Sequence, residues 1–150
     1  MELNEKDNYG WYPLYWAIFY NNIEIVQLLI DYALQHQIIL KVNEKDKYGD
    51  YPLLWAIRKN NIEIVQLLID YANQHQIILE LNEKDKDGNY PLLLAIRNNN
   101  IEIVQLLIDY ALQHQIILEY DKKDIEDNPK IKNLLQNYEK EMENRKKVIK

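Results

Sequence analysis

The side chains that could bind a metal ion or transfer a proton recur along this chain at a fixed spacing of 39 residues. The histidines with this spacing are His36, His75 and His114. A parallel series of aspartates consists of Asp31, Asp70 and Asp109. Imidazole and carboxylate groups are common general acids and bases and common ligands of Zn²⁺. If they clustered in space, these residues would indicate a metal centre or a proton-transfer site.

A second set of carboxylates lies in short charged segments, of which Glu5-Lys6-Asp7 is the first. Its aligned copies could hold Ca²⁺, but they lack the dense D-x-D-x-D-G order of a calcium loop. The sequence contains no G-x-x-x-x-G-K-[ST], G-x-S-x-G or H-E-x-x-H motif. Phosphate-loop, serine-hydrolase and zinc-peptidase sites therefore have no support. We expect no catalytic residues, no metal and no cofactor, and a protein that is not an enzyme.

The fixed spacing belongs to the whole sequence and not only to these residues. Residues 4–42, 43–81 and 82–120 align without a gap and differ at ten of their 39 columns. Such a period indicates a stacked array, in which each unit buries its apolar face against the next. Stacked helices lie roughly 8–10 Å apart, which is too far for neighbouring imidazoles to share a metal ion. The histidines are therefore expected to be structural, for example through hydrogen bonds along the stack.

The middle unit begins with a turn and a short helix. The segment 46–50 carries turn-forming residues, and Gly49 is expected to be left-handed. Pro52 suits the first position of a helix because that position needs no N–H donor. The apolar stretch 53–57 continues this helix, which should end near Lys59.

A second helix is predicted directly afterwards. Residues 60–63, Asn-Asn-Ile-Glu, have the spacing of a capping box, in which Glu63 reaches back to free N–H groups. Apolar residues at helical spacing mark a broad buried face from Ile62 onwards, and the helix should continue to about His75. The segment 77–81 is rich in β-branched residues and is predicted to be extended or frayed helix.

Two stretches of each unit resemble the ankyrin repeat. In the third unit they are residues 85–96, D-K-D-G-N-Y-P-L-L-L-A-I, and residues 100–108, N-I-E-I-V-Q-L-L-I. The family pattern is roughly D-x-x-G-x-T-P-L-H-x-A followed by x-E-I-V-x-L-L-L, and the match recurs in all three units, over residues 1–120. The resemblance implies an all-α solenoid of stacked helix-turn-helix units that binds other proteins.

The units depart from the ankyrin pattern in two ways. Tyrosine replaces the family's threonine, and tyrosine or leucine replaces its histidine. The replaced positions are Tyr12, Tyr51 and Tyr90, then Tyr15, Leu54 and Leu93. Apolar packing must therefore substitute for the usual polar link between threonine and histidine. The period also exceeds the family's usual length of about 33 residues, so a longer second helix or a larger outer loop is expected.

The C-terminal end carries the sequence of a cap. Residues 128–138 align with residues 61–71, but Lys132 and Gln136 replace two apolar residues of the interior units. A polar outward face is what a terminal repeat requires for solubility. Residues 121–150 are therefore predicted to be a C-terminal half-repeat with a capping helix.

The first unit shows no such change, because Val26 and Ile30 are the same as in the interior units. An open apolar end has three explanations: a longer array, self-association, or binding of a partner by the nearby aromatic residues. Self-association through this uncapped repeat is thus one expectation.

The columns that differ between units indicate where a partner could bind. Seven of the ten lie in the turn and the first helix, and in ankyrin proteins this strip lines the concave face and contacts partners. Tyrosine, tryptophan and arginine are suited to anchor an interface. The expected partner-binding residues are Asn8, Tyr9, Trp11, Tyr15, Phe19, Tyr20, Lys47, Tyr48, Asp50, Arg58, Lys59, Asp87, Asn89, Arg97 and Asn98. The alternative is neutral variation at exposed positions, with the first-unit aromatics covering an open end.

Composition limits the class of partner. The net charge of −6 argues against nucleic acid and against anionic membranes, since both attract basic surfaces. The first residues show no secretory signal, and no apolar run is long enough to span a bilayer. The chain has no cysteine, so disulfides are excluded. A cytoplasmic location is expected.

These expectations combine into one prediction. Residues 1–150 form a single ankyrin-repeat domain, with repeats at 4–42, 43–81 and 82–120 and a cap at 121–150. The domain is a non-catalytic module that binds another protein on the concave face. Two alternatives stay open: a structural spacer within a longer array, and an engineered or consensus-derived scaffold without a natural partner. The near-identical second helices are the reason to consider a scaffold, and recent duplication explains them equally well.

Overall fold

The computed structural model describes residues 2–149, and all regular structure within them is helical. One layer consists of the short helices α1 (Pro13–Phe19), α3 (Pro52–Arg58) and α5 (Pro91–Arg97). The other consists of the longer helices α2 (Ile23–Gln35), α4 (Ile62–Gln74) and α6 (Ile101–His114). A 3₁₀ turn, η1 (Lys122–Ile125), precedes the final helix, α7 (Pro129–Ile149).

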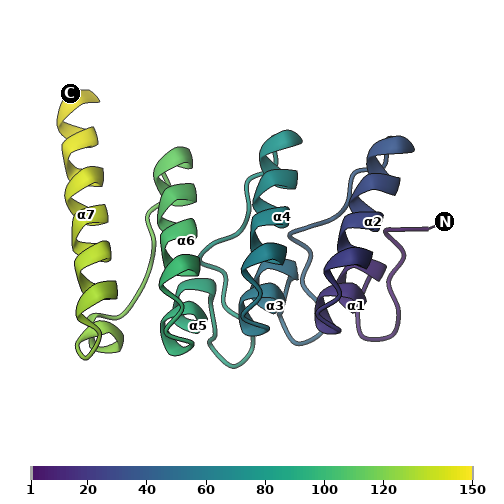
Figure 1. Ribbon diagram of the computed structural model, residues 1–150, viewed down its shortest axis with the longest axis horizontal. Helices are drawn as coiled ribbons and strands as arrows, with labels where there is room; N and C mark the ends of the chain where they lie inside the picture. The colour runs from purple at the N-terminus through teal and green to yellow at the C-terminus, as the bar shows by residue number, and fades with distance from the viewer. Residues whose placement is uncertain (1, 150) are drawn as a thin grey trace.

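The helices stand side by side in sequence order, with the two termini at opposite ends of the row (Figure 1). Each short helix packs against the next short helix, each long helix packs against the next long one, and α7 packs against α6. The prediction of an all-α solenoid of helix pairs with a C-terminal helix is confirmed. No helix in the described part of the chain has the length and apolar character that crossing a membrane requires.

Each short helix begins at a proline and is followed by a left-handed asparagine. In the middle unit Pro52 occupies the first helical position, where a missing N–H costs nothing. Asn60 follows the helix in the left-handed region, with φ of 56°. The amide of Asn61 then donates to the carbonyl of Ala56 at 3.1 Å, which satisfies a free carbonyl of the last turn.

The second helix starts one residue later than the capping box predicts. The N-cap is Asn61, whose side chain accepts from the amide of Ile64 at 3.0 Å. The predicted capping box at residues 60–63 is therefore wrong. Its first residue, Asn60, is used to end the preceding helix, so Glu63 lies one position too early to complete the box.

A left-handed glutamine follows the second helix. Gln76 has φ of 58°, and the amide of Ile77 donates to the carbonyl of Ala72 at 2.9 Å. This is the Schellman pattern with glutamine at the position where glycine is usual. The α4 helix thus ends at Gln74, and residues 77–80 have no helical structure, so the frayed-helix alternative is wrong.

An invariant tyrosine connects each long helix to the unit before it. The hydroxyl of Tyr71 accepts from the amide of Leu40 at 2.8 Å, and that of Tyr110 accepts from the amide of Leu79 at 2.9 Å. In the final helix, Tyr138 repeats the contact with Leu118 at 3.0 Å. Each hydroxyl satisfies a backbone donor that is buried between two units, which explains why the C-terminal cap keeps this tyrosine.

The turns also contact one another. The amide of Lys47 donates to the carbonyl of Tyr9 at 3.1 Å, and the amide of Lys86 donates to the carbonyl of Tyr48 at 3.0 Å. Gly49 is left-handed, with φ of 81°, and lies against the next turn. A Cβ added there would lie 3.0 Å from the Cα of Asp85. Glycine is needed at this position both for its conformation and for the close approach.

The two ends of the row differ in polarity, as expected. The residues that form the open N-terminal end are not the expected ones. In α7, Lys132 and Gln136 are exposed, while Ile131 and Leu135 are buried. Helix α7 therefore has a polar outer face and an apolar inner one.

At the other end, Val26 and Ile30 are buried, so the expectation that they form an open apolar face is wrong. Their side of α2 is the side that packs into the stack. The open face is made by Ile25 and Leu28, which are 45% and 65% exposed. The equivalent of Ile25 in the second unit, Ile64, is fully buried against the preceding unit.

Candidate functional site

An aspartate organises each turn on the side of the short helices. In the middle unit, one carboxylate oxygen of Asp46 accepts from the backbone amides of Tyr48 and Asp50, both at 2.9 Å. Asp7 and Asp85 bind the amides of their own turns in the same way. This arrangement leaves the second oxygen of each carboxylate free to accept from side chains.

Those second oxygens bind residues that differ between the units. The indole nitrogen of Trp11 donates to Asp46 at 2.8 Å, and that of Trp55 donates to the same oxygen at 3.3 Å. The indole nitrogen of Trp16 donates to Asp7 at 2.8 Å. At the turn of the third unit, arginine replaces tryptophan: an Nη of Arg58 donates to the free oxygen of Asp85 at 2.9 Å.

The tryptophans belong to a compact aromatic cluster centred on Trp11. Its ring centroid lies 4.5 Å from that of Trp16, 5.1 Å from Phe19 and 5.6 Å from Trp55. The contacts with the two tryptophans are edge-on, the geometry in which the positive ring edge meets the negative ring face. Tyr20 stacks on Trp16 at 5.8 Å and is 68% exposed. The cluster therefore reaches from the core to the surface.

An arginine joins the second and third units beside this cluster. Arg58 donates to Asp50 at 3.0 Å as well as to Asp85. Burial raises the pKa of Asp50 to about 6, although the hydrogen bond from Arg58 favours the charged form. Burial also disfavours charge on Asp85, but hydrogen bonds, led by that from the Asn89 backbone, lower its pKa below the usual value.

The turns and short helices enclose a groove of about 560 Å³, which we call the aromatic groove. Its lining residues are Tyr9, Trp11, Trp16, Phe19, Tyr48, Asp50, Trp55, Arg58, Asp87 and Asn89. All ten belong to only four columns of the 39-residue alignment, and all four columns differ between units.

The structure separates the sequence-predicted residues into three groups. Those that line the aromatic groove are Tyr9, Trp11, Phe19, Tyr48, Asp50, Arg58, Asp87 and Asn89. Those at the surface outside its lining are Asn8, Tyr20, Lys47, Lys59, Arg97 and Asn98. One residue, Tyr15, is fully buried. Its expected place on the concave face is therefore wrong: it occupies the core position that Leu54 and Leu93 fill in the other units.

The prediction left out two residues of the groove, Trp16 and Trp55. Their column differs between units, with Leu94 in the third, so the signal that identified the other residues applied to them as well. Trp11 and Asp50, in contrast, were expected to be exposed and are mostly buried. Each makes a polar contact there: Trp11 donates to Asp46, and Asp50 accepts from Arg58.

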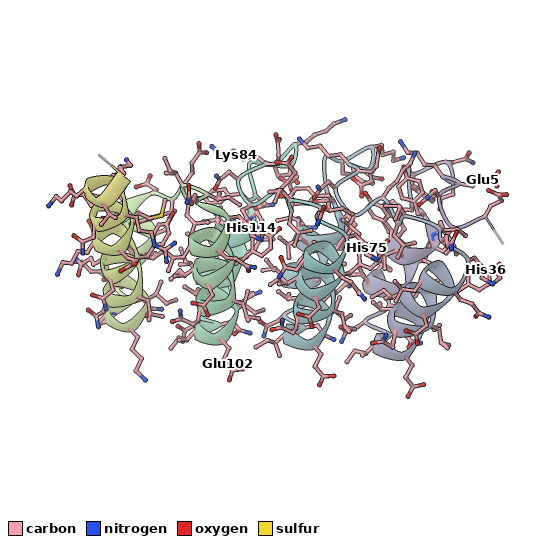
Figure 2. All side chains as sticks on the ribbon, turned by 90° about the horizontal axis from the view of Figure 1, so that it is seen from above. Glu5, His36, His75, Lys84, Glu102 and His114 are labelled. Carbon is pink, nitrogen blue, oxygen red and sulfur yellow. The ribbon has the colours of Figure 1, made fainter. Side chains whose placement is uncertain are left out.

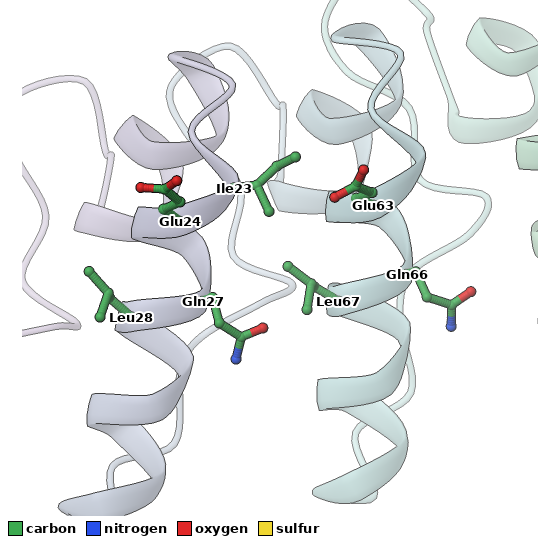
Figure 3. Close-up of a pocket in the computed structure, with 7 residues that line it drawn as sticks. All are labelled: Ile23, Glu24, Gln27, Leu28, Glu63, Gln66 and Leu67. Atoms are coloured by element: carbon green, nitrogen blue, oxygen red, sulfur yellow. The ribbon is translucent and has the colours of Figure 1, made fainter.

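A second groove, of about 640 Å³, lies on the opposite layer between α2 and α4, and we call it the outer groove (Figure 3). Figure 3 shows Ile23, Gln27 and Leu67 in the space between the two helices. All seven lining residues belong to columns that are identical in every unit. The outer groove is thus a regular product of the stacking of α2 and α4.

The histidines follow the stack, one for each helix pair (Figure 2). His114 lies 3.0 Å from the side-chain oxygen of Asn73 in the preceding unit. Each ring also packs on a tyrosine of its own helix, for example Tyr71 on His75 at 4.3 Å. No three potential metal ligands come together within residues 2–149. These contacts agree with the expected structural role.

The comparisons with known proteins point to one family. A family model described as ankyrin repeats (three copies) matches residues 1–77 and, in an overlapping second match, residues 32–124. A comparison with curated proteins gives no match. The family match extends over most of the chain and agrees with the stack of helix pairs and left-handed turn glycines. Ankyrin repeats are in general protein-interaction modules without enzymatic activity. The chain belongs to the ankyrin-repeat family.

Proposed function

We propose that this chain is a non-catalytic module that binds another protein in the aromatic groove. Residues 1–150 then act as one domain, with repeats at 4–42, 43–81 and 82–120 presenting the groove and residues 121–150 capping the stack. The surface that supports this proposal is the face formed by the turns and the short helices.

A contrast between the two grooves carries the proposal. The outer groove is lined only by invariant columns, whereas the aromatic groove is lined only by columns that differ between units. The columns that build the stack are identical in each unit because packing constrains them. Variation concentrated in one groove is what recognition of a single, asymmetric partner requires. Aromatic and arginine side chains are also those that dominate protein interfaces.

The test is a comparative pull-down with substitutions that the fold already tolerates. Trp16→Leu and Phe19→Arg give the first unit the residues of the third, Leu94 and Arg97. The wild-type chain should retain a protein that this double variant loses. A control variant in the outer groove, Glu63→Gln with Gln66→Ala, should retain it as the wild type does. Loss from both variants, or from neither, would contradict the proposal.

A second interaction surface is supported by the exposed face of α2. We propose that a second copy of the chain covers Ile25 and Leu28 in a two-fold contact. On α4 the equivalent residues are Ile64, which is fully buried, and Leu67, which is partly buried, so these residue types suit an apolar interface. The outer face of α7 carries Lys132 and Gln136 instead, which disfavours head-to-tail stacking.

Light scattering tests this contact independently of the aromatic groove. The mass of the wild-type chain should rise towards that of a dimer as its concentration increases. A Leu28→Gln variant should remain a monomer, and Leu106→Gln, on the equivalent face of α6, serves as a control for altered stability. A wild-type mass that stays monomeric at every concentration would overturn the contact.

A further inference from the structure

The three tryptophans of the chain all line the aromatic groove, and all three indole N–H groups are already used. Trp11 and Trp55 donate to Asp46, and Trp16 donates to Asp7. A partner therefore finds no indole donor in the groove, only ring faces and edges. A hydrogen bond from an indole to a carboxylate moves electron density towards the ring, which makes the ring face more attractive to a cation.

The hydrogen bonds that surround Asp7 keep its carboxylate charged. Burial disfavours the charge, but the backbone amides of Trp11 and Tyr9 and the indole of Trp16 donate to it and lower its pKa below the usual value. Asp7 is therefore an anion at neutral pH, held at the N–H edge of the Trp16 indole.

Cations of the chain itself already lie on rings of this cluster. The Nζ of Lys59 is 4.4 Å from the ring centroid of Phe19, and the Cζ of Arg58 is 4.7 Å from that of Trp55. The Nζ of Lys47 lies 4.7 Å from the ring of Tyr9 and 5.1 Å from that of Tyr48. All of these distances are within the range of about 6 Å in which a ring attracts a cation.

These cations differ in how firmly they are held. Arg58 is fixed by Asp50 and Asp85. Among residues 2–149, neither Lys47 nor Lys59 is within ion-pair distance of a carboxylate, so a stronger guest can displace them at low cost. No lysine or arginine of this part of the chain lies over the rings of Trp11 or Trp16.

We propose that the aromatic groove takes up a cationic side chain, arginine or lysine, of the partner protein against Trp16 and Phe19. This inference rests on the proposed function and names the chemistry of the partner for the same groove. The volume of about 560 Å³ accommodates such a side chain together with part of its backbone. The net charge of −6 and the exposed carboxylate of Asp87 in the lining favour a basic segment.

The rival occupant is an apolar side chain, and a set of small probes separates the two. The cationic probe is N-acetyl-arginine amide, the neutral isostere is the citrulline amide, and the apolar probe is the leucine amide. Tryptophan emission is the readout, because every tryptophan of the chain lies in the groove. The arginine amide should bind saturably, about five-fold more tightly than the citrulline amide, as expected for one cation–π contact. Equal or tighter binding of the citrulline or leucine amide would overturn the inference.

Two variants make the test specific. Phe19→Arg, which copies the residue of the other units, places a cation of the chain itself at the site and should weaken binding of the arginine amide by about ten-fold. Lys59→Gln removes the cation on Phe19 and should tighten binding by about two- to five-fold. A variant that only disturbed the packing of the groove would not bind the arginine amide more tightly. Lys84→Gln, whose lysine lies over Tyr90 outside the groove, is the matched control and should change nothing.

Failure of this inference and failure of the proposed function are distinguishable. If Trp16→Leu with Phe19→Arg loses a partner protein but the probes show no preference for arginine, the groove binds a partner and the cationic occupant is wrong. If Lys59→Gln leaves the affinity for the arginine amide unchanged or lowers it, the displacement of Lys59 is wrong as well.

Discussion

The indole nitrogen of Trp11 donates to the carboxylate of Asp46 at 2.8 Å, and one unit later Arg58 donates to Asp85 at 2.9 Å. Two different side chains thus satisfy the same free oxygen of an invariant turn aspartate. The same two columns are in contact in every unit: Trp11 packs on Phe19, Asp50 binds Arg58, and Asn89 binds Arg97. The variation between units therefore alters the surface of the groove without leaving the turn carboxylate unsatisfied.

The turn glycines should differ in their tolerance of alanine. Gly49 and Gly88 are both left-handed, but only Gly49 has the neighbouring turn within contact distance of an added Cβ. Alanine at either position should cost about 1 kcal/mol through backbone strain. Gly49→Ala should cost at least about 1 kcal/mol more, because the turn of Asp85 must move. Urea unfolding measures both, and equal losses would contradict the close approach.

A hydrogen-bond partner for His75 should stabilise the folded chain. His114 lies beside Asn73, whereas the position equivalent to Asn73 in the preceding unit is Leu34, and the buried Nε2 of His75 has no partner among the described residues. Leu34→Asn should raise the free energy of unfolding by about 1 kcal/mol. Leu112→Asn is the control, since no equivalent histidine follows it. A loss of stability in Leu34→Asn as large as that in the control would contradict the account.

The buried hydroxyl of Tyr15 should be dispensable. Tyr15 fills a core position with no hydrogen-bond partner for its hydroxyl in the described part of the chain, while the hydroxyl of Tyr51 donates to the carbonyl of Glu83 at 2.8 Å. Tyr15→Phe should leave stability unchanged or raise it by up to about 1 kcal/mol. Tyr51→Phe should lower stability by about 1 kcal/mol. Thermal unfolding of the pair measures this, and a larger loss in Tyr15→Phe would show that its hydroxyl is bound.

The burial of Asp50 predicts that the difference in stability between the wild type and Asp50→Asn depends on pH. Its pKa is raised to about 6, so the folded state binds a proton more tightly than the unfolded state does. The stability that this proton contributes is present at low pH and is lost as the pH rises through about 4 to 6. Asp50→Asn, which copies the third unit's Asn89, lacks this loss. Its stability relative to wild type should therefore be higher at pH 7.5 than at pH 4.5, by about 1 kcal/mol.

Comparing the difference between the two chains at each pH removes the contribution of titrating groups that do not interact with Asp50. A difference that stays constant with pH would show that Asp50 is not perturbed by burial. Arg58 keeps its second partner, Asp85, in the variant, so the contact between the second and third units persists.

Much of the fold could be predicted from the sequence because it is local and repeated. Proline at the first helical position, the turn glycine and helical apolar spacing define the helix pairs in every unit. The capping box was wrong because Asn60 could either start the second helix or end the first, and the sequence pattern does not distinguish the two. The open end was assigned to Val26 and Ile30 because both sides of α2 are apolar.

The candidate site was harder to predict because exposure depends on contacts between units. Variation identified the strip that lines the aromatic groove, but it could not separate Tyr15, which is buried in the core, from Phe19, one turn later, which lines the groove. It also could not show that Asp7 and Asp46 accept hydrogen bonds from the indole N–H groups. Those contacts join residues that lie up to 35 positions apart.

Site-specific photocrosslinking tests the central claim most directly. Benzoylphenylalanine replaces Phe19 in the aromatic groove of one chain and Glu63 in the outer groove of another. If the aromatic groove binds the partner, the first chain should yield one discrete protein adduct that is absent from the second. Adduct formation at Glu63 alone, or to the same extent at both positions, would contradict the account.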